Sequence, residues 1–256
     1  MTKIIGILNY TANSFSDGGN YNSLDGATER VQKLLQQGAD IVDIGASATS
    51  YGAKLNTEME EWHRLRPLLD KIDLKNVSID TYHYSTMKNA IDLGVLYIND
   101  VSGGKDKRIL KLISVHPDVH YICMYSLCLP ADKSVRVKSV NEIYNWTESK
   151  IDECKKYGIS NKRIIIDPGI GFTTNAEQSL EVLKNIERLQ DFGVKICVGH
   201  SRKSFLESMT NYPPEERDIE TVATSLYMLL KNVDYIRVHN IEMHQRAFKV
   251  FYNLLN

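Results

Sequence analysis

The sequence predicts a single α/β domain that spans residues 1–256 and folds as a (β/α)8 barrel of the TIM type. Two observations predict it. Short apolar runs alternate with longer amphipathic stretches along the whole chain, and there are eight of the short runs. Strands that alternate with helices form a parallel sheet, and eight strands are the number that closes into such a barrel. An open doubly wound sheet is the alternative, but it usually has fewer strands and a glycine-rich first turn.

The predicted strands are residues 4–9, 41–44, 77–80, 97–99, 120–124, 163–167, 195–198 and 235–238. The predicted helices are residues 24–37, 57–71, 86–93, 140–157, 176–189, 220–230 and 242–254. In the first helix the apolar residues Leu24, Ala27, Val31, Leu34 and Leu35 recur at helical spacing. No linker, low-complexity run or change in composition divides the chain, so we expect one domain.

The composition excludes several classes of protein. Lys and Arg number 31 against 32 Asp and Glu, and a net charge of −1 indicates no nucleic-acid partner and no anionic membrane surface. No apolar run approaches the roughly 20 residues of a membrane span. The first residues lack the pattern of a signal peptide. The four cysteines form no CxxC pair. We therefore expect a cytoplasmic protein with reduced thiols.

Polar side chains stand at, or just past, the C-terminal ends of six predicted strands. They are Asn9, Asp43, Asp80, Asn99, Asp167 and His239. Any one of them could start a turn or cap a helix. Barrel enzymes assemble their active sites at this end from several strands, so six polar residues there favour a site.

The types of these side chains indicate the ligand. Asp80, Asn99 and Asp167 offer two carboxylates and an amide, which suit a flat heterocycle with N–H donors and a carbonyl. Residues 167–172 (DPGIGF) place glycines beside the carboxylate and an aromatic ring beyond it. Loops after strands 7 and 8 of such barrels often bind phosphate. Arg237 and His239 alternate along the eighth strand, so we expect them to form an anion clamp there.

Two rim loops, residues 9–19 and 45–56, are longer than most strand-to-helix connections and are expected to close over a substrate. Their sequences and those of the strand ends, taken in order, resemble the dihydropteroate synthase family over nearly the whole chain. The matching motifs are residues 6–9 (GILN), 14–19 (SFSDGG), 38–45 (GADIVDIG), 78–81 (SIDT), 98–104 (INDVSGG), 167–172, 201–204 (SRKS) and 237–239 (RVH).

The resemblance implies a transferase of folate biosynthesis, in a family that sulfonamides target. It would join 6-hydroxymethyl-7,8-dihydropterin pyrophosphate to p-aminobenzoate, giving 7,8-dihydropteroate and pyrophosphate. It implies pterin contacts from Asp80, Asn99, Met124, Asp167, Phe172, Gly199, Lys203 and Arg237. It implies p-aminobenzoate contacts from Phe15, Thr49, Lys203 and Ser204. The implied catalytic residues are Asn9, Lys203, Arg237 and His239, with Asn9 also a Mg²⁺ ligand. A homodimer is one assembly that the resemblance allows.

Several positions depart from the family pattern. Asn13 stands at an Asp, Ser50 at an Arg and Tyr51 at a Pro of the two rim loops. Tyr125 replaces a His, and His200 occupies a generally apolar or small position. Two other functions remain open: a pterin-binding methyltransfer module, and a catalytically impaired pterin-binding homologue. The lysine and the anion residues speak against the first, and the altered loops motivate the second.

Overall fold

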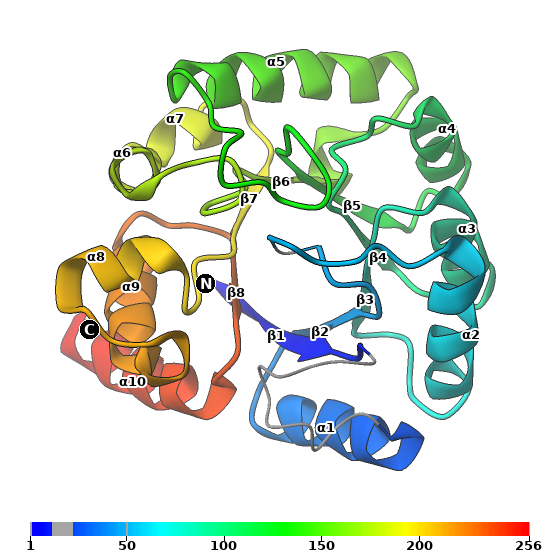
Figure 1. The fold of residues 1–256 in the computed structure, drawn as a ribbon, viewed down its shortest axis with the longest axis horizontal. Coiled ribbons are helices and arrows are strands. Elements are labelled where there is room, and N and C mark those ends of the chain that lie inside the picture. The colour runs from blue at the N-terminus through cyan, green and yellow to red at the C-terminus, as the bar shows by residue number, and fades with distance from the viewer. Residues whose placement is uncertain (1, 12–22, 50, 256) are drawn as a thin grey trace.

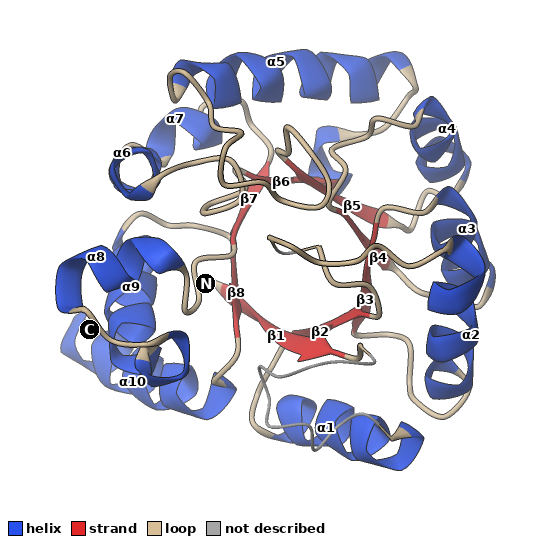
Figure 2. Cartoon of the chain, in the orientation of Figure 1, coloured by secondary structure: helices blue, strands red, loops and turns tan. Residues whose placement is uncertain are grey.

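The computed structural model describes residues 2–11, 23–49 and 51–255. They form a closed barrel of eight parallel strands that pair in sequence order, with the last strand returning to the first (Figure 1). The helices surround this barrel on its outer side (Figure 2). The closure confirms the predicted (β/α)8 architecture and excludes the open sheet.

The strands are β1 (Lys3–Asn9), β2 (Ile41–Gly45), β3 (Val77–Thr81), β4 (Tyr97–Asp100), β5 (His120–Met124), β6 (Ile164–Asp167), β7 (Lys195–Val198) and β8 (Tyr235–Val238). The helices are α1 (Leu24–Gln36), α2 (Glu58–Leu69), α3 (Tyr84–Asp92), α4 (Lys107–Val115), α5 (Asn141–Lys156), α6 (Ala176–Lys184), α7 (Glu187–Gln190), α8 (Ser204–Thr210), α9 (Asp218–Leu230) and α10 (Ile241–Leu255). Two 3₁₀ helices cover Asn161–Arg163 and Pro214–Glu216.

Three elements differ from the prediction. α4 and α8 were not expected; they have nine and seven residues, although the apolar residues of α4 recur at helical spacing. The predicted helix 176–189 divides into α6 and α7, since the backbone leaves the helical region at Asn185, with φ −111° and ψ 30°. No helix in the described part of the chain is long and apolar enough to cross a membrane.

The interior of the barrel has two chemically different layers. Side chains two residues apart on a strand face the same way, so one strand can contribute to both layers, as β2, β5, β6 and β8 do. The lower interior layer is apolar and sealed, with every member at most 2% exposed: Ile5, Ile41, Ile122, Ile165, Cys197 and Tyr235. The upper interior layer, toward the C-terminal ends of the strands, consists of Asp43, Asp80, Asn99, Met124, Asp167 and Arg237. The fold therefore places the predicted polar residues on an apolar floor.

Candidate active site

Arg237 lies at the centre of the upper interior layer and holds two carboxylates. Its Nη2 is 2.9 Å from Asp167 Oδ2, and its Nη1 is 3.5 Å from Asp43 Oδ2. All three side chains are buried. The guanidinium lies against the backbone of Gly199, where a Cβ atom would stand only 2.9 Å from Nη2. A larger residue than glycine at position 199 would therefore displace the arginine.

Asp43 joins Arg237 to Asn99, a position in the site to which the sequence assigned no role. Its Oδ2 accepts a hydrogen bond from Asn99 Nδ2 at 2.8 Å as well as the contact with Arg237. Asp43 Oδ1 and Asn99 Oδ1 are both buried, and neither has a hydrogen-bond partner among the described residues. A buried acceptor without a donor costs free energy. These two oxygens are therefore poised to accept N–H groups from a ligand.

Asp80 completes the acidic side of the site. Its carboxyl group lies over Gly45, where a Cβ would be 3.4 Å from Oδ2. Burial raises the pKa of Asp80 well above its ordinary value, and the nearby Asp43 carboxylate raises it further. A carboxyl group that keeps its proton can donate a hydrogen bond as well as accept one. Asp80 can therefore match either a donor or an acceptor on the edge of a heterocycle.

The turn after β6 orients the second predicted carboxylate. Asp167 Oδ1 accepts the Gly169 N–H at 2.8 Å, which leaves its Oδ2 for Arg237. Gly169 has φ +69°, and a Cβ there would meet the Tyr125 carbonyl oxygen at 2.2 Å. The turn consequently requires glycine, which explains the glycine beside the carboxylate in the sequence.

Lys203 approaches the same turn from the loop after β7. Its Nζ donates to the Ile170 carbonyl oxygen at 2.5 Å and stands 4.1 Å from the centre of the Phe172 ring. Gly171, with φ +76°, makes room for it, because a Cβ there would be 2.8 Å from Lys203 Cδ. Desolvation lowers the pKa of Lys203 to about 7, against the opposing attraction of Asp167. Its charge therefore changes near neutral pH.

A cavity of about 190 Å³ lies next to Lys203 and Phe172. It brings together three of the predicted residues, Phe172, Lys203 and Ser204, and adds Tyr51, Lys133 and Arg136 among its lining. The predicted Thr49 does not line it, but its carbonyl oxygen accepts the Ala131 N–H at 2.9 Å and joins the two loops beside it. The predicted Phe15 lies outside the described residues.

The loop after β5 contributes to this cavity, and the sequence analysis missed it. Arg136 Nη1 donates to the Phe172 carbonyl oxygen at 3.1 Å, and Lys133 Nζ stands 5.0 Å from the centre of the Tyr51 ring. Two cations within a long polar loop were the available signal. Together with Lys203 they outnumber the one acidic residue of the lining, Asp132, so the cavity has a positive balance that suits a carboxylate.

His239 and Ser201 are in contact where the loops after β8 and β7 meet, at the C-terminal end of the barrel, which we call the mouth. Ser201 Oγ is 2.9 Å from His239 Nδ1 and accepts the His239 backbone N–H at 3.3 Å. Burial, followed by the charge of Arg202, lowers the pKa of His239 to about 3. In the tautomer of the neutral ring that carries its proton on Nε2, Nδ1 accepts the Ser201 hydroxyl. The guanidinium of Arg237 contacts Asp43 and Asp167, so the anion clamp expected from Arg237 and His239 stays a prediction.

Asn9 ends β1 beside Gly45 of β2. The side chain is partly exposed and has no hydrogen-bond partner among the described residues. Met124 lies within the upper interior layer, fully buried beside Asp167. The fold therefore brings all the described pterin-contact candidates to one end of the barrel.

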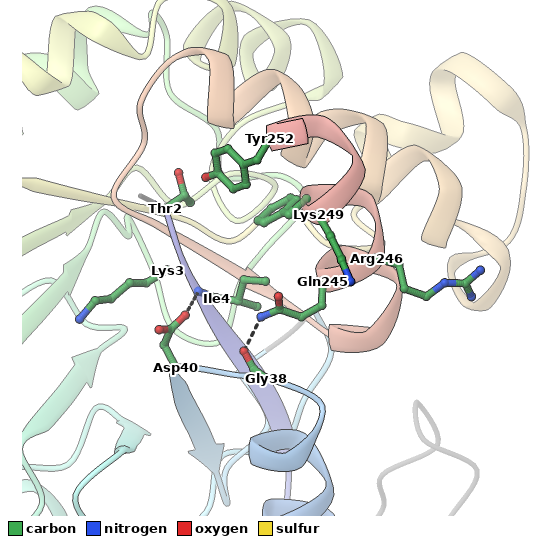
Figure 3. A pocket seen from close by; sticks show the side chains of 10 residues that line it. Thr2, Lys3, Ile4, Gly38, Asp40, Gln245, Arg246, Lys249 and Tyr252 are labelled. Carbon is green, nitrogen blue, oxygen red and sulfur yellow. Dashed lines mark hydrogen bonds between the residues drawn. The ribbon is translucent and has the colours of Figure 1, made fainter. Parts of the chain in front are cut away.

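A larger cavity of about 610 Å³ lies at the opposite end, between the start of β1 and α10 (Figure 3). Its polar groups are largely paired with the backbone: Asp40 Oδ2 accepts the Ile4 N–H at 2.8 Å, and Gln245 donates to the Gly38 carbonyl oxygen at 2.6 Å. The cationic side chains of Lys3 and Arg246 point away from each other. The convergent polar groups of the mouth make it the better candidate for an active site.

Known proteins resemble this chain in both sequence and fold. The family model for pterin binding enzymes matches residues 5–239. A dihydropteroate synthase from Clostridium beijerinckii is 37% identical over 254 residues, covering 97% of this chain and 93% of that protein. A dihydropteroate synthase from Bacillus subtilis is 31% identical over 258 residues, covering 100% of this chain and 89% of that protein.

Solved structures agree with these matches. The crystal structure of dihydropteroate synthase from Anaplasma phagocytophilum, with bound 6-hydroxymethylpterin-monophosphate, superposes with a TM-score of 0.88 at 33% identity, covering 100% of this chain and 99% of that chain. That of Xanthomonas albilineans, in complex with 7,8-dihydropteroate, has a TM-score of 0.87 at 27% identity, covering 99% and 93%. The chain therefore belongs to the dihydropteroate synthase family of pterin binding enzymes.

Proposed function

We propose that the protein condenses 6-hydroxymethyl-7,8-dihydropterin pyrophosphate with p-aminobenzoate, giving 7,8-dihydropteroate and pyrophosphate. The observation that carries the proposal is the upper interior layer, in which the buried oxygens Asp43 Oδ1 and Asn99 Oδ1 have no partner among the described residues and lie above an apolar floor. In the reaction the aromatic amine forms a C–N bond to the exocyclic methylene carbon. The C–O bond to pyrophosphate breaks, pyrophosphate departs with the electron pair, and the amine nitrogen loses a proton.

The pterin ring would bind in the upper interior layer. Its amino and ring N–H groups match the oxygens of Asn99 and Asp167, and its carbonyl matches a donor such as Lys203. Asp80 keeps its proton to a higher pH than usual and can therefore pair with a ring nitrogen of either kind. Met124 would pack against the ring face, since it lies in the same layer and is fully buried.

The methylene carbon can become cationic because the electron-rich pterin ring delocalises the charge. Departure of pyrophosphate then needs stabilisation of negative charge rather than a strong nucleophile. His239, in the tautomer protonated at Nε2, and the guanidinium of Arg237 would donate hydrogen bonds to the departing pyrophosphate. The aromatic amine is mostly neutral at pH 7, so no strong general base is required.

We also propose Mg²⁺ as the cofactor. Among the described residues, no three His, Cys, Asp or Glu side chains gather as a metal cluster. Mg²⁺ is commonly held by few protein oxygens together with substrate phosphates and water. The amide oxygen of Asn9, partly exposed and unpaired within the described residues, fits such a ligand set. Mg²⁺ would neutralise charge on the leaving pyrophosphate.

The second substrate would occupy the cavity beside Phe172. The benzoate ring would lie against this aromatic side chain, and its carboxylate would face the positive lining made by Lys133, Arg136 and Lys203. Ser204 begins α8, so its backbone N–H adds a donor there. This arrangement favours a synthase over a methyltransfer module, which has no carboxylated aromatic substrate to bind.

We further propose that the protein is a cytoplasmic homodimer. The four cysteines are unpaired, which supports a reducing compartment. The exposed stripe of α9 is entirely apolar: Ile219, Ala223, Tyr227 and Leu230. On α10, beside it, Val250 and Leu254 are 61% and 80% exposed. Two copies that bury these stripes against each other would remove this apolar surface from water. Light scattering would report a mass of two chains.

One assay tests the proposed reaction. We expect pyrophosphate release to require both the pterin pyrophosphate and p-aminobenzoate, and 7,8-dihydropteroate to appear in equal amount. EDTA should abolish the release and Mg²⁺ should restore it. Tight pterin binding without any pyrophosphate release would identify instead a homologue that has lost catalysis.

A further inference from the structure

Three fully buried side chains lie behind Ser201 and His239, the part of the mouth that we call the anion side. They are His200 directly after β7, Ser225 in α9 and His244 in α10. We infer that they are positioning residues, which hold the loops after β7 and β8 in the arrangement that binds pyrophosphate. The inference rests on the proposed function for the identity of the anion. Sequence patterns marked only His200, as a polar residue at an apolar or small position.

Ser225 joins the two histidines. Its Oγ is 2.8 Å from His200 Nε2 and 2.9 Å from His244 Nε2. The far side of the His244 ring is fixed too, because Nδ1 is 2.6 Å from the Asn240 carbonyl oxygen. A carbonyl oxygen only accepts hydrogen bonds, so His244 carries its proton on Nδ1.

This assignment sets the direction of the whole chain of hydrogen bonds. Burial lowers the pKa of both rings, that of His200 to about 4, so both are neutral near pH 7. His244 Nε2 is then an acceptor, and the Ser225 hydroxyl, which also lies 2.9 Å from the Thr221 carbonyl oxygen, is the group that can donate to it. In that arrangement His200 donates from Nε2, which lies 2.8 Å from Ser225 Oγ and 3.2 Å from the Thr221 carbonyl oxygen. Removing the Ser225 hydroxyl therefore leaves His244 Nε2 buried without its donor, whereas His200 keeps the Thr221 carbonyl oxygen as a second partner.

The chain of hydrogen bonds closes a circuit around the anion side. At one end His200 precedes Ser201, which bonds to His239. At the other end Asn240 follows His239 directly and is tied to His244. The circuit therefore joins the loop after β7 to the loop after β8 through α9 and α10. Ser201 directly follows His200, and His239 directly precedes Asn240. The two residues that would face the anion are therefore each next to a residue that the circuit holds in place.

A second connection runs beside the first through the same helix. Asp218 of α9 accepts from Arg202 Nε at 2.8 Å and from Asn240 Nδ2 at 2.8 Å. It thereby links the same two loops by an ion pair, with both side chains partly exposed at about a fifth of their surface. Salt screens such a partly exposed pair more than a buried neutral bond. The buried His200–Ser225–His244 chain is consequently the connection that persists at high ionic strength.

The location of the circuit predicts a selective effect. It holds the residues proposed for pyrophosphate, while Asp80 and Asn99 stand on β3 and β4, on other strands of the barrel. Loosening it should weaken anion binding more than pterin binding, because only Gly199, Lys203 and Arg237 of the proposed pterin contacts lie on β8 or in the loop after β7. A residue that served stability alone would weaken both or neither.

Ser225→Ala tests this with little change of volume. The matched control is Thr224→Val, because Thr224 neighbours it on α9 and its hydroxyl makes only a bond to the Glu220 carbonyl oxygen. We would titrate each protein with inorganic pyrophosphate plus Mg²⁺ and, separately, with 6-hydroxymethylpterin. Ser225→Ala should lose about three- to tenfold in pyrophosphate affinity, as expected for one hydrogen bond, and less than twofold in pterin affinity. Thr224→Val should change neither.

A second pair of variants guards against a folding defect. His200→Leu removes the donor and should reproduce the loss, whereas His200→Gln keeps an N–H at similar reach and should recover most of the affinity. Thermal unfolding of each variant checks the fold. Equal losses for both ligands, no loss in Ser225→Ala and His200→Leu, or no recovery in His200→Gln would overturn the inference. The pyrophosphate-release assay decides the proposed function separately, because a protein that binds pyrophosphate without turnover can still show the selective loss.

Discussion

The two interior layers of the barrel come from the same strands, two residues apart, yet they have opposite chemistry. Ile41 lies in the lower interior layer and Asp43 in the upper, and Ile165 and Asp167 repeat the pattern on β6. The lower layer is sealed from water and holds no charge, whereas the upper layer gathers three carboxylates around one arginine. A step of two residues along a strand thus leads from the layer that stabilises the barrel to the layer proposed to bind the pterin.

The contrast between the two layers explains how the barrel tolerates a buried charged site. The apolar layer supplies stability without specific partners. The charged layer depends on pairing, because Arg237 neutralises carboxylates that would otherwise be buried and uncompensated. Substitutions in the lower layer should therefore impair stability alone, whereas substitutions in the upper layer should also impair binding and turnover.

The largest effect should follow from Arg237→Ala. It leaves Asp43 and Asp167 buried without their counter-charge, so we expect a loss of about 3–5 kcal/mol in the free energy of unfolding, together with loss of turnover. Urea denaturation measures the first and pyrophosphate release the second. Arg66→Ala is the control, since its pair with Asp70 is about half exposed and screened by solvent and should contribute little to stability. Equal effects of the two variants would show that the buried pairs have no special role.

Ile165→Ala should break the lower layer alone. Removing a fully buried side chain leaves a cavity, and we expect a loss of about 2–5 kcal/mol in the free energy of unfolding. Assayed well below its melting temperature, the variant should keep kcat/KM within about twofold of the parent. A large fall in kcat/KM without loss of stability would mean that the two layers are not separable.

Lys203 should make stability depend on pH. Its pKa is about 7 in the folded protein against 10.5 for an ordinary lysine. Below pH 7 it is charged in both the folded and unfolded states, and the folded protein carries the full cost of desolvating it. As pH rises from about 7 toward 10.5 the folded form loses this proton and the cost disappears. Lys203→Met should therefore stabilise the protein most below pH 7, with an advantage that shrinks at higher pH in urea titrations. A difference that does not vary with pH would show that this pKa is not depressed.

The smallest effect concerns Asn13 and Ser50, which lie outside the described residues. Both differ from the family pattern, in which an Asp and an Arg could pair as the loops close. We expect Asn13→Asp alone to lower kcat/KM by about two- to fivefold, because it places an unpaired charge there, and Ser50→Arg to restore part of the loss. Additive effects in the double-mutant cycle would show that the two loops are not coupled at these positions.

The barrel and the polar mouth could be predicted because their signals are local. Eight apolar runs, six of them with a polar residue at or just past the C-terminal end, appear directly in the sequence. The pairing could not be predicted in the same way. Arg237 and Asp43 are 194 positions apart, and His200, Ser225 and His244 meet only because α9 and α10 pack together behind β7 and β8. Such contacts depend on the closed barrel, which no local pattern specifies.

Within the site, the residues on the strands were easier to predict than the residues in the surrounding loops. Asp80, Asn99 and Asp167 sit on strands, whose direction fixes where their side chains go. The cavity beside Phe172 is built partly from the loop after β5, whose residues Lys133 and Arg136 have no periodic signal. Loops carry function without a repeating pattern, so their contribution appears only in the structure.

Titration of 6-hydroxymethylpterin into three proteins tests most directly whether the upper interior layer is the pterin site. Asp167→Asn keeps the shape of the side chain but removes its charge, and we expect it to bind the pterin about 10- to 100-fold more weakly than the parent, because a charged hydrogen bond to the ring is lost. Asp80→Ala should lose a similar amount. Ile165→Ala, two residues below Asp167 on the same strand, should bind as the parent does. Unchanged affinity in both aspartate variants, or an equal loss in Ile165→Ala, would contradict the assignment of binding to the upper layer.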